Sequence, residues 1–275
     1  MRKFIGKFLA VVVGPYCGNV VLRKTQYRLS ESEEECTKIA KNIIFGKLFN
    51  SRWVIERATR DYSNSLDVEK LKNVSLQIKN SMESISDCVD TASLRGVEGE
   101  AATRYFSVFD DLILRQKDDF FFRERNRRPP TDAVNAMLSF SYTMLTSMVT
   151  SALYCVGLDP FVGYLHKDRP GRASLALDMI EELRSVFADR FVITMINRKS
   201  VNKADFITKE NGAVMFTDNG KKKFLQSWQN KKLTEIKHPY LEEKVQWGMV
   251  PYVQALLLAR YLRGDIDGYP PFLWK

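Results

Sequence analysis

The side chains best suited to chemistry in this sequence are carboxylates and one histidine that can bind a metal ion. His166 is one of only two histidines in 275 residues, and it precedes Asp178 within the segment GYLHKDRPGRASLALDMIEELR. Glu98 lies much earlier in the chain. Together they would form a mixed oxygen and nitrogen site that suits Mg²⁺ or Mn²⁺. Such an ion activates a water or a 3′-hydroxyl at a phosphodiester, so these three residues are the candidate catalytic and metal-binding residues.

A helix predicted over Ser174–Ala188 would carry the acids of one half of this site. Apolar residues recur on one face at helical spacing, and Asp178, Glu181 and Glu182 fall opposite them. Neighbouring carboxylates repel one another unless a cation or solvent compensates. From this helix alone a solvated polar face is the favoured interpretation. Glu182 is assigned to that face.

Glu98 is predicted to lie at the entrance of a helix over Gly99–Lys117. Gly96 and Gly99 flank it, and glycine allows the backbone to approach another group closely. A carboxylate at a helix start also interacts favourably with the helix dipole without binding anything. A ligand role and a structural role are both open at this point.

The charge balance favours a polyanionic partner. The chain carries 42 basic and 33 acidic residues, giving a formal charge of +9 and a pI of about 9.3. Nucleic acid is the commonest partner of such a protein, although a basic protein with scattered charge has the same composition. The four cysteines are widely spaced and form no C-x-x-C pair. This pattern argues against a zinc site or a disulfide framework and suits a reducing cytosol.

Two basic clusters are candidate contacts for DNA phosphates. Arginine offers two parallel hydrogen bonds to a phosphate, but acidic neighbours such as Glu124 and Asp132 could absorb part of the charge. The two interpretations are evenly balanced. The candidate residues are Arg123, Arg125, Arg127 and Arg128 in one loop, and Lys167 and Arg169 beside His166.

The pattern of apolar residues predicts a mainly α-helical protein. An alternating stretch with Asn211-Gly212 at a turn predicts a short β-hairpin inserted between helices. The apolar segment after Asp132 is long enough to span a bilayer, but Asn135 and several Ser and Thr residues identify it as a buried central helix. Helices are predicted after Ser30 and over Leu66–Ser81, Ser84–Leu94, Gly99–Lys117, Thr131–Val156, Ser174–Ala188 and Val250–Leu262.

Three long motifs resemble successive signatures of one known family. They are GVEGEAATRYF, RNRRPPTDAVNAMLSFSYTML and GYLHKDRPGRASLALDMIEELR. In this order they resemble the universal CRISPR-associated integrase and endonuclease family called "Cas one", in the form found with type I systems. The resemblance extends from about Gly6 to Lys275.

The resemblance implies a function and a set of site residues. The metal-binding acid, histidine and aspartate of the family fall on Glu98, His166 and Asp178, and a second acid falls on Glu181. Family members use Mn²⁺ or Mg²⁺ to insert spacers into the CRISPR array, by attack of a prespacer 3′-hydroxyl on repeat DNA. The implied partners are double-stranded DNA and the "Cas two" protein. A homodimer in the prokaryotic cytoplasm, without membrane association, is also implied.

The resemblance also identifies one departure from the family pattern. The family has an N-terminal β domain, whereas this chain begins at FLAVVV, which reads as the last strand of that domain. The segment GNVVLRKTQYR is predicted to be a second extended piece or a linker. Residues 1–18 are therefore assigned to a remnant strand and linker, and residues 19–275 to a helical catalytic domain. The alternative function is a truncated, catalytically inactive module that binds DNA or a protein partner.

Overall fold

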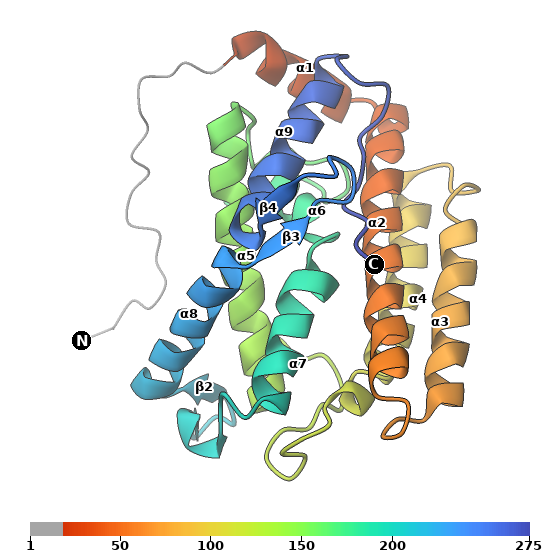
Figure 1. Ribbon diagram of the computed structural model, residues 1–275. Helices are drawn as coiled ribbons and strands as arrows, with labels where there is room; N and C mark the ends of the chain where they lie inside the picture. Colours follow the sequence, from red (N-terminus) through yellow and green to blue (C-terminus); the bar gives the residue numbers. More distant parts are fainter. Residues whose placement is uncertain (1–18) are drawn as a thin grey trace.

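A long helix forms one side of the fold. The computed structural model describes residues 19–275, in which α2 (Glu33–Asp61) begins where Ser32 Oγ accepts the Glu35 amide at 3.4 Å. Helices α3 (Val68–Glu83) and α4 (Thr91–Ser107) pack against α2 (Figure 1). The apolar residues of α2 that recur at helical spacing, such as Ile39 and Ile43, are completely buried. This packing bears out the mainly α prediction.

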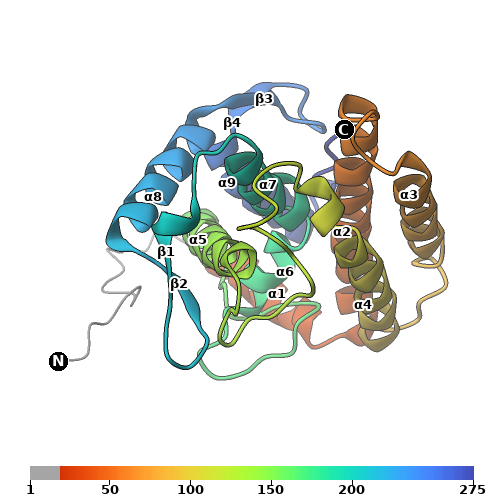
Figure 2. The same cartoon turned by 90° about the horizontal axis from the view of Figure 1, so that it is seen from below.

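The second side of the fold is built on α5 (Ala133–Val156), which packs against α9 (Val250–Leu262) and α6 (Ser174–Ile180) (Figure 2). Leu138, Leu145 and Val149 on α5 are fully buried, as expected for a central helix. Within residues 19–275, no helix combines the length and the apolar character needed to cross a membrane.

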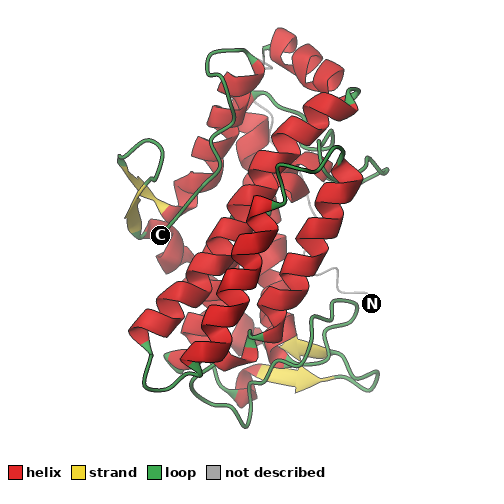
Figure 3. Cartoon of the chain, turned by 90° about the vertical axis from the view of Figure 1, so that its right-hand side faces the viewer, coloured by secondary structure: helices red, strands yellow, loops and turns green. Residues whose placement is uncertain are grey.

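Two small antiparallel hairpins complete the fold (Figure 3). Strands β1 (Phe206–Thr208) and β2 (Val214–Phe216) flank the predicted Asn211-Gly212 turn, where Gly212 has φ +78°. This hairpin was predicted. Helix α8 (Asp218–Leu233) follows it, and a second hairpin comes next. That hairpin, β3 (Glu235–Lys237) with β4 (Lys244–Gln246), was not predicted, because its strands are as short as those of the first hairpin and no Asn-Gly turn lies between them.

The chain before α2 forms a helix instead of the predicted extended segment. Helix α1 (Val20–Ser30) begins where Asn19 Oδ1 accepts the Val21 amide at 3.0 Å, and this cap outweighs the β-branched residues at its start. The strand predicted within residues 1–18 lies outside the described residues. The proposed domain boundary therefore stays a prediction.

Helix α4 begins earlier than predicted. Asp90 and Ser93 form a capping box at its start, so the helix predicted over Ser84–Leu94 is wrong and Glu98 lies in mid-helix, one residue from Gly99. A Cβ added at Gly99 would meet nothing within 4 Å. This glycine therefore does not mark a close approach to another group.

The predicted helix Ser174–Ala188 is interrupted. Helix α6 ends at Ile180, the π-helical segment η2 (Arg184–Asp189) follows, and α7 (Arg190–Asn197) continues the chain. Segments of π-helix often mark functional sites. Asp178, Glu181 and Glu182 are all buried here, because α2, α5 and the C-terminal segment surround this part of the chain.

Candidate metal site

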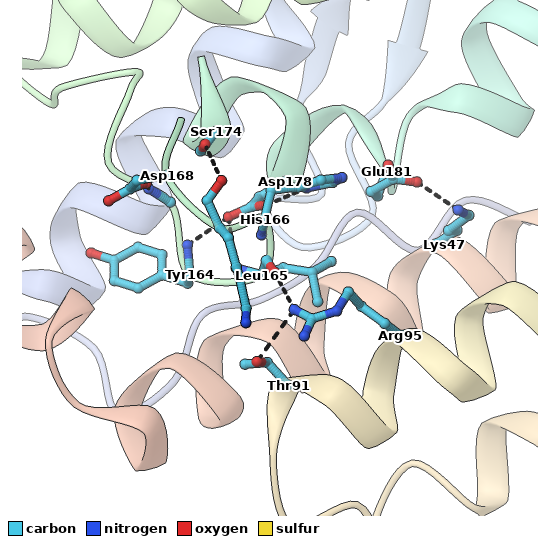
Figure 4. Close-up of polar contacts among 12 residues, drawn as sticks. Lys47, Thr91, Arg95, Tyr164, Leu165, His166, Asp168, Ser174, Asp178 and Glu181 are labelled. Atoms are coloured by element: carbon cyan, nitrogen blue, oxygen red, sulfur yellow. Dashed lines mark hydrogen bonds and ion pairs between the residues drawn. The ribbon is translucent and has the colours of Figure 1, made fainter. Parts of the chain in front are cut away.

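Asp178 holds the loop that carries His166. Its Oδ2 accepts the amides of Tyr164 at 2.6 Å and Leu165 at 3.0 Å, and its Oδ1 accepts the amide of His166 at 2.9 Å (Figure 4). The loop passes so close that a Cβ at Gly163 would lie 2.8 Å from Asp178 Oδ2 and 2.9 Å from the backbone of Ser174. Only glycine fits there without a shift of the backbone.

The same carboxylate orients the imidazole of His166. The Nδ1 atom lies 2.6 Å from Asp178 Oδ1, so a proton on Nδ1 would be donated to the carboxylate and Nε2 would remain as an acceptor or ligand atom. Asp178 was expected to bind the ion directly. In the structure it is fully buried, and both of its oxygens accept hydrogen bonds from the loop and the imidazole.

Lys47 of α2 brings Glu98 and Glu181 together. Its Nζ lies 2.6 Å from Glu181 Oε2 and also forms an ion pair with Glu98 Oε1 (Figure 4 shows its contact with Glu181). On the other side of Glu181, Arg184 Nη2 lies 2.8 Å from Oε1. Glu98 of α4 and Glu181, which directly follows α6, therefore share one ammonium group.

The charges around Glu181 keep it ionised. Burial by itself raises the pKa of this carboxyl, but Arg184 and Lys47 outweigh burial and His166 adds to their effect, so that the pKa falls to about 2. Glu181 Oε2 is buried and makes no well-aligned hydrogen bond despite its contact with Lys47. This oxygen becomes available as a ligand atom when the Lys47 ammonium moves away.

The donor set suits a hard divalent cation. Glu98 and Glu181 offer oxygens and His166 offers Nε2, and the Lys47 ammonium already occupies a position between the two carboxylates that favours a cation. Among the described residues, no three His, Cys, Asp or Glu side chains are grouped closely enough to hold an ion without rearrangement. An ion bound by both acids would have to displace the ammonium.

Lys47 was missed by the sequence reading. The sequence feature that could have identified it is a single lysine within the apolar run IIFGKLFN. A charge carried on a buried helix requires an opposite charge nearby. Its side chain is only 12% exposed. The sequence does not reveal which acids pair with it.

A small cavity of about 50 Å³ adjoins Lys47 and Glu98. Arg127, Arg184 and Tyr105 contribute to its wall. Arg127, predicted to contact DNA, is thus placed beside the candidate metal ligands. Asp189 and Tyr142 also line this cavity, and Asp189 accepts a hydrogen bond from the Tyr142 hydroxyl at 2.6 Å. Burial raises the pKa of the Asp189 carboxyl to about 6.

The remaining basic candidates fall into two groups. Arg125 builds its own loop, because it donates to Asn135 Oδ1 at 2.7 Å and to Ser139 Oγ at 3.0 Å and stacks on Tyr142. A structural role for Arg125 is thus favoured over phosphate contact. The others are solvent-exposed and form no ion pair with a described carboxylate: Arg123, Arg127, Arg128, Lys167 and Arg169.

Glu182 is not part of a solvated face, contrary to the prediction. It is completely buried and accepts the Phe272 amide at 2.5 Å and the Tyr269 hydroxyl, while Gln254 donates to it at 3.3 Å. Burial outweighs these donors and raises the pKa of Glu182 to about 7. Glu182 therefore fixes the C-terminal segment, while its neighbour Glu181 faces Lys47.

Comparison with protein families identifies one match over most of the chain. The model described as "CRISPR associated protein Cas1" matches residues 3–230. A "CRISPR-associated endonuclease Cas1 1" of Chlorobaculum tepidum is 46% identical over 270 residues, which are 98% of this chain and 79% of that protein. A "CRISPR-associated endonuclease Cas1" of Leptospira interrogans is 44% identical over 255 residues, covering 93% of this chain and all of the relative.

Solved structures of the same kind share the fold. A casposase bound to its integration product has a TM-score of 0.80 and 25% identity, over 93% of this chain and 73% of the casposase chain. A CAS1 protein from Thermotoga maritima has a TM-score of 0.74 and 24% identity, over 90% of this chain and 73% of that chain. A partial Cas6-RT-Cas1–Cas2 complex has a TM-score of 0.79 and 22% identity, over 98% of this chain and 78% of that chain.

Proposed function

Because the chain belongs to the Cas1 family of CRISPR-associated proteins, we propose that it is a divalent-metal-dependent DNA endonuclease and integrase that acts in CRISPR adaptation. The observation that carries the metal dependence is the Lys47 ammonium held between Glu98 and Glu181, beside a histidine whose Nδ1 is already engaged. Two acids and an imidazole nitrogen are the ligand types that Mn²⁺ and Mg²⁺ accept in proteins.

Glu98, Glu181 and Nε2 of His166 would hold the ion. When bound, a divalent ion stabilises the charge that develops on a phosphodiester under attack by water or a 3′-hydroxyl. In this arrangement Asp178 does not bind the ion itself. It accepts a hydrogen bond from Nδ1 of His166, which orients the imidazole, and it holds the backbone of the loop. We therefore assign Asp178 as a positioning residue and Glu181 as the third ligand.

Basic residues beside the acids would hold the DNA. Arg127 lies in the wall of the cavity next to Glu98, and Lys167 and Arg169 are exposed on the loop beside His166. Arginine and lysine in such positions bind phosphate oxygens and set the register of the backbone. The scissile phosphate would thus be held where the acids converge.

The proposed binding partners are those found with proteins of similar structure. One similar solved structure is a casposase bound to an integration product, and another contains Cas1 with Cas2. We propose that this chain acts on prespacer and repeat DNA together with "Cas two", as a homodimer in the cytoplasm of a prokaryote. The alternative is a module that binds DNA or a partner without catalysis.

Removal of the metal tests the proposed activity. We expect the protein to nick a supercoiled plasmid and to join 3′-hydroxyl duplexes to a repeat-containing target in Mn²⁺ or Mg²⁺, and to do neither in EDTA. A duplex with 3′-dideoxy ends is the control, because it should lose joining and leave nicking unchanged. DNA binding in EDTA without nicking or joining in either metal would favour the binding module.

Lys47→Met is expected to tighten Mn²⁺ binding by about tenfold. The ammonium competes with the ion for the same two carboxylates, and its loss leaves their charges uncompensated. The metal-free variant should be less stable than the parent, with a larger rise in Tm on addition of Mn²⁺. Calorimetric titration and thermal melts measure the two effects.

Lys38→Met is the matched control for this variant. Lys38 lies on the same helix and also pairs with two acids, Glu34 and Glu35, both at 2.8 Å. These pairs are far from the proposed metal ligands and more exposed, so Mn²⁺ affinity should be unchanged. Unchanged or weaker Mn²⁺ binding in Lys47→Met would show that the lysine does not compete with the ion.

A further inference from the structure

A second group of basic side chains surrounds Trp274 near the C-terminal end. Arg57 of α2 and Arg190 of α7 stack on the Trp274 ring, with guanidinium carbons 4.6 and 4.7 Å from its centroid. Lys231, near the end of α8, lies 4.5 Å from the Trp247 centroid, and Lys275 lies 5.5 Å from that of Trp53. Arg57, Arg190 and Lys231 thus meet on the Trp247–Trp274 pair, whose ring centroids are 5.1 Å apart, while Lys275 lies on Trp53.

These cations have no carboxylate partners in the described part of the chain. Arg57, Arg190 and Lys231 form no ion pair within residues 19–275. The Nε of Arg57 and an Nη of Arg190 are buried without a hydrogen-bond partner, although Arg57 also donates to the main-chain oxygen of Lys275 at 3.5 Å. The nearby acid Asp61 is engaged by Arg60 at 2.9 Å.

The mutual repulsion of these groups is substantial. Burial, together with the charges of Arg190, Arg57 and Arg198, lowers the pKa of Lys231 to about 8. Burial and the charge of Arg57 lower the pKa of Arg190 to about 10. Each cation–π contact offsets only about 0.5 to 2 kcal/mol. A bound anion would compensate the remaining charge.

Two of these cations, Arg57 and Lys275, line a cavity that can accept such an anion, whereas Arg190 and Lys231 are not part of its lining. The cavity measures about 490 Å³ and is lined by Arg57, Lys237, Trp274 and Lys275 together with apolar side chains. Its lining residues come from α2, from β3 and the residues after it, and from the C-terminal segment, and in Figures 1 and 2 β3 and the C-terminal segment lie on the side of α2 opposite α4. It is therefore separate from the site around Glu98, which α4 carries.

We propose that Arg57, Lys237 and Lys275, which line this cavity, form a second, metal-independent site that binds phosphate groups, and that Arg190 and Lys231 add positive charge beside it. Guanidinium and ammonium groups bind phosphate through charge-assisted hydrogen bonds, and Arg57, Lys237 and Lys275 bring such groups to the wall of the cavity. The phosphates belong to a DNA backbone that passes over this face or to a free phosphate compound. Assignment to DNA rests on the proposed function, whereas phosphate binding itself does not.

Calorimetric titration with pyrophosphate in EDTA tests the site. We expect the parent to bind pyrophosphate and Arg57→Gln/Arg190→Gln to bind it at least tenfold more weakly. The control is Arg104→Gln/Arg263→Gln, which removes the same charge from arginines paired with Glu100 and Asp265 and should bind like the parent. Because the buried pair also packs on Trp274, a second variant, Lys237→Gln/Lys275→Gln, changes only exposed groups and should also weaken binding.

A second arm of the experiment identifies the source of the phosphate. The log–log slope of duplex DNA affinity against salt concentration, measured in EDTA, should fall by about 2 for Lys237→Gln/Lys275→Gln, since each phosphate contact contributes about 0.9. An unchanged slope, with pyrophosphate binding lost, would support the site and assign it to a free phosphate compound. A parent that does not bind pyrophosphate, or variants equal to the control, would overturn the proposal. Both arms run in EDTA and measure neither cleavage nor joining, so failure here is distinct from failure of the metal site.

Discussion

Glu181→Gln is expected to reduce metal-dependent DNA cleavage and joining by at least about 10²-fold, the usual cost of removing one charged or polar group that stabilises a transition state. Glutamine keeps the shape of the side chain but removes the negative charge that faces Lys47 and Arg184. If Glu181 is the third ligand, Mn²⁺ affinity falls along with the rate. Single-turnover rates and calorimetric titration of Mn²⁺ measure the two quantities. His166→Ala and Glu98→Ala should show the same losses of rate and of Mn²⁺ affinity.

Glu182→Gln is the matched control for this experiment. The two glutamates are adjacent and equally inaccessible to solvent, but Glu182 faces Tyr269 and Phe272. Because its pKa is raised to about 7, this carboxyl is partly protonated at neutral pH, and a neutral amide resembles that state. The control should therefore retain cleavage and Mn²⁺ affinity. If Glu181→Gln were as active as Glu182→Gln, Glu181 would not be a ligand.

Asp178→Ala is expected to lower the free energy of unfolding by about 3 to 5 kcal/mol and to abolish activity. The substitution leaves three amides, those of Tyr164, Leu165 and His166, without an acceptor, and each buried unsatisfied group costs about 1 to 3 kcal/mol. Urea denaturation measures the loss of stability. Since this variant can fail to fold at all, it does not by itself separate a positioning role from a ligand role.

Asp178→Asn makes that separation. It keeps one oxygen and the shape of the side chain, so the fold should survive, but it weakens the hold on Nδ1 of His166. We expect a mixture of imidazole tautomers in ¹⁵N spectra, and a loss of Mn²⁺ affinity of about 10- to 100-fold, typical of a group that orients a ligand. Asp168→Asn, an exposed acid of the same loop, should change neither. A single tautomer with parental metal affinity would contradict the positioning role.

Much of the fold follows from local patterns. The helical spacing of apolar residues identified most of the helices, including α9 with its observed bounds, and Asn211-Gly212 identified the first hairpin. These signals depend on neighbours within a few residues, so they can be read along the chain. Where a capping residue started a helix at another position than the apolar spacing indicated, as Asp90 does for α4, the predicted boundary was wrong.

The sequence by itself determined the types of residue at the site, since the three motifs single out Glu98, His166 and two acids after it. Only the tertiary structure decided how the roles are divided. It directs Asp178 to the loop and the imidazole, Glu181 to Lys47, and Glu182 to the C-terminal segment. The physical reason is that a buried charge is defined by its partners, and here those partners come from distant parts of the chain. Helical period alone placed all three acids on one solvated face, whereas packing buried each of them against a different group.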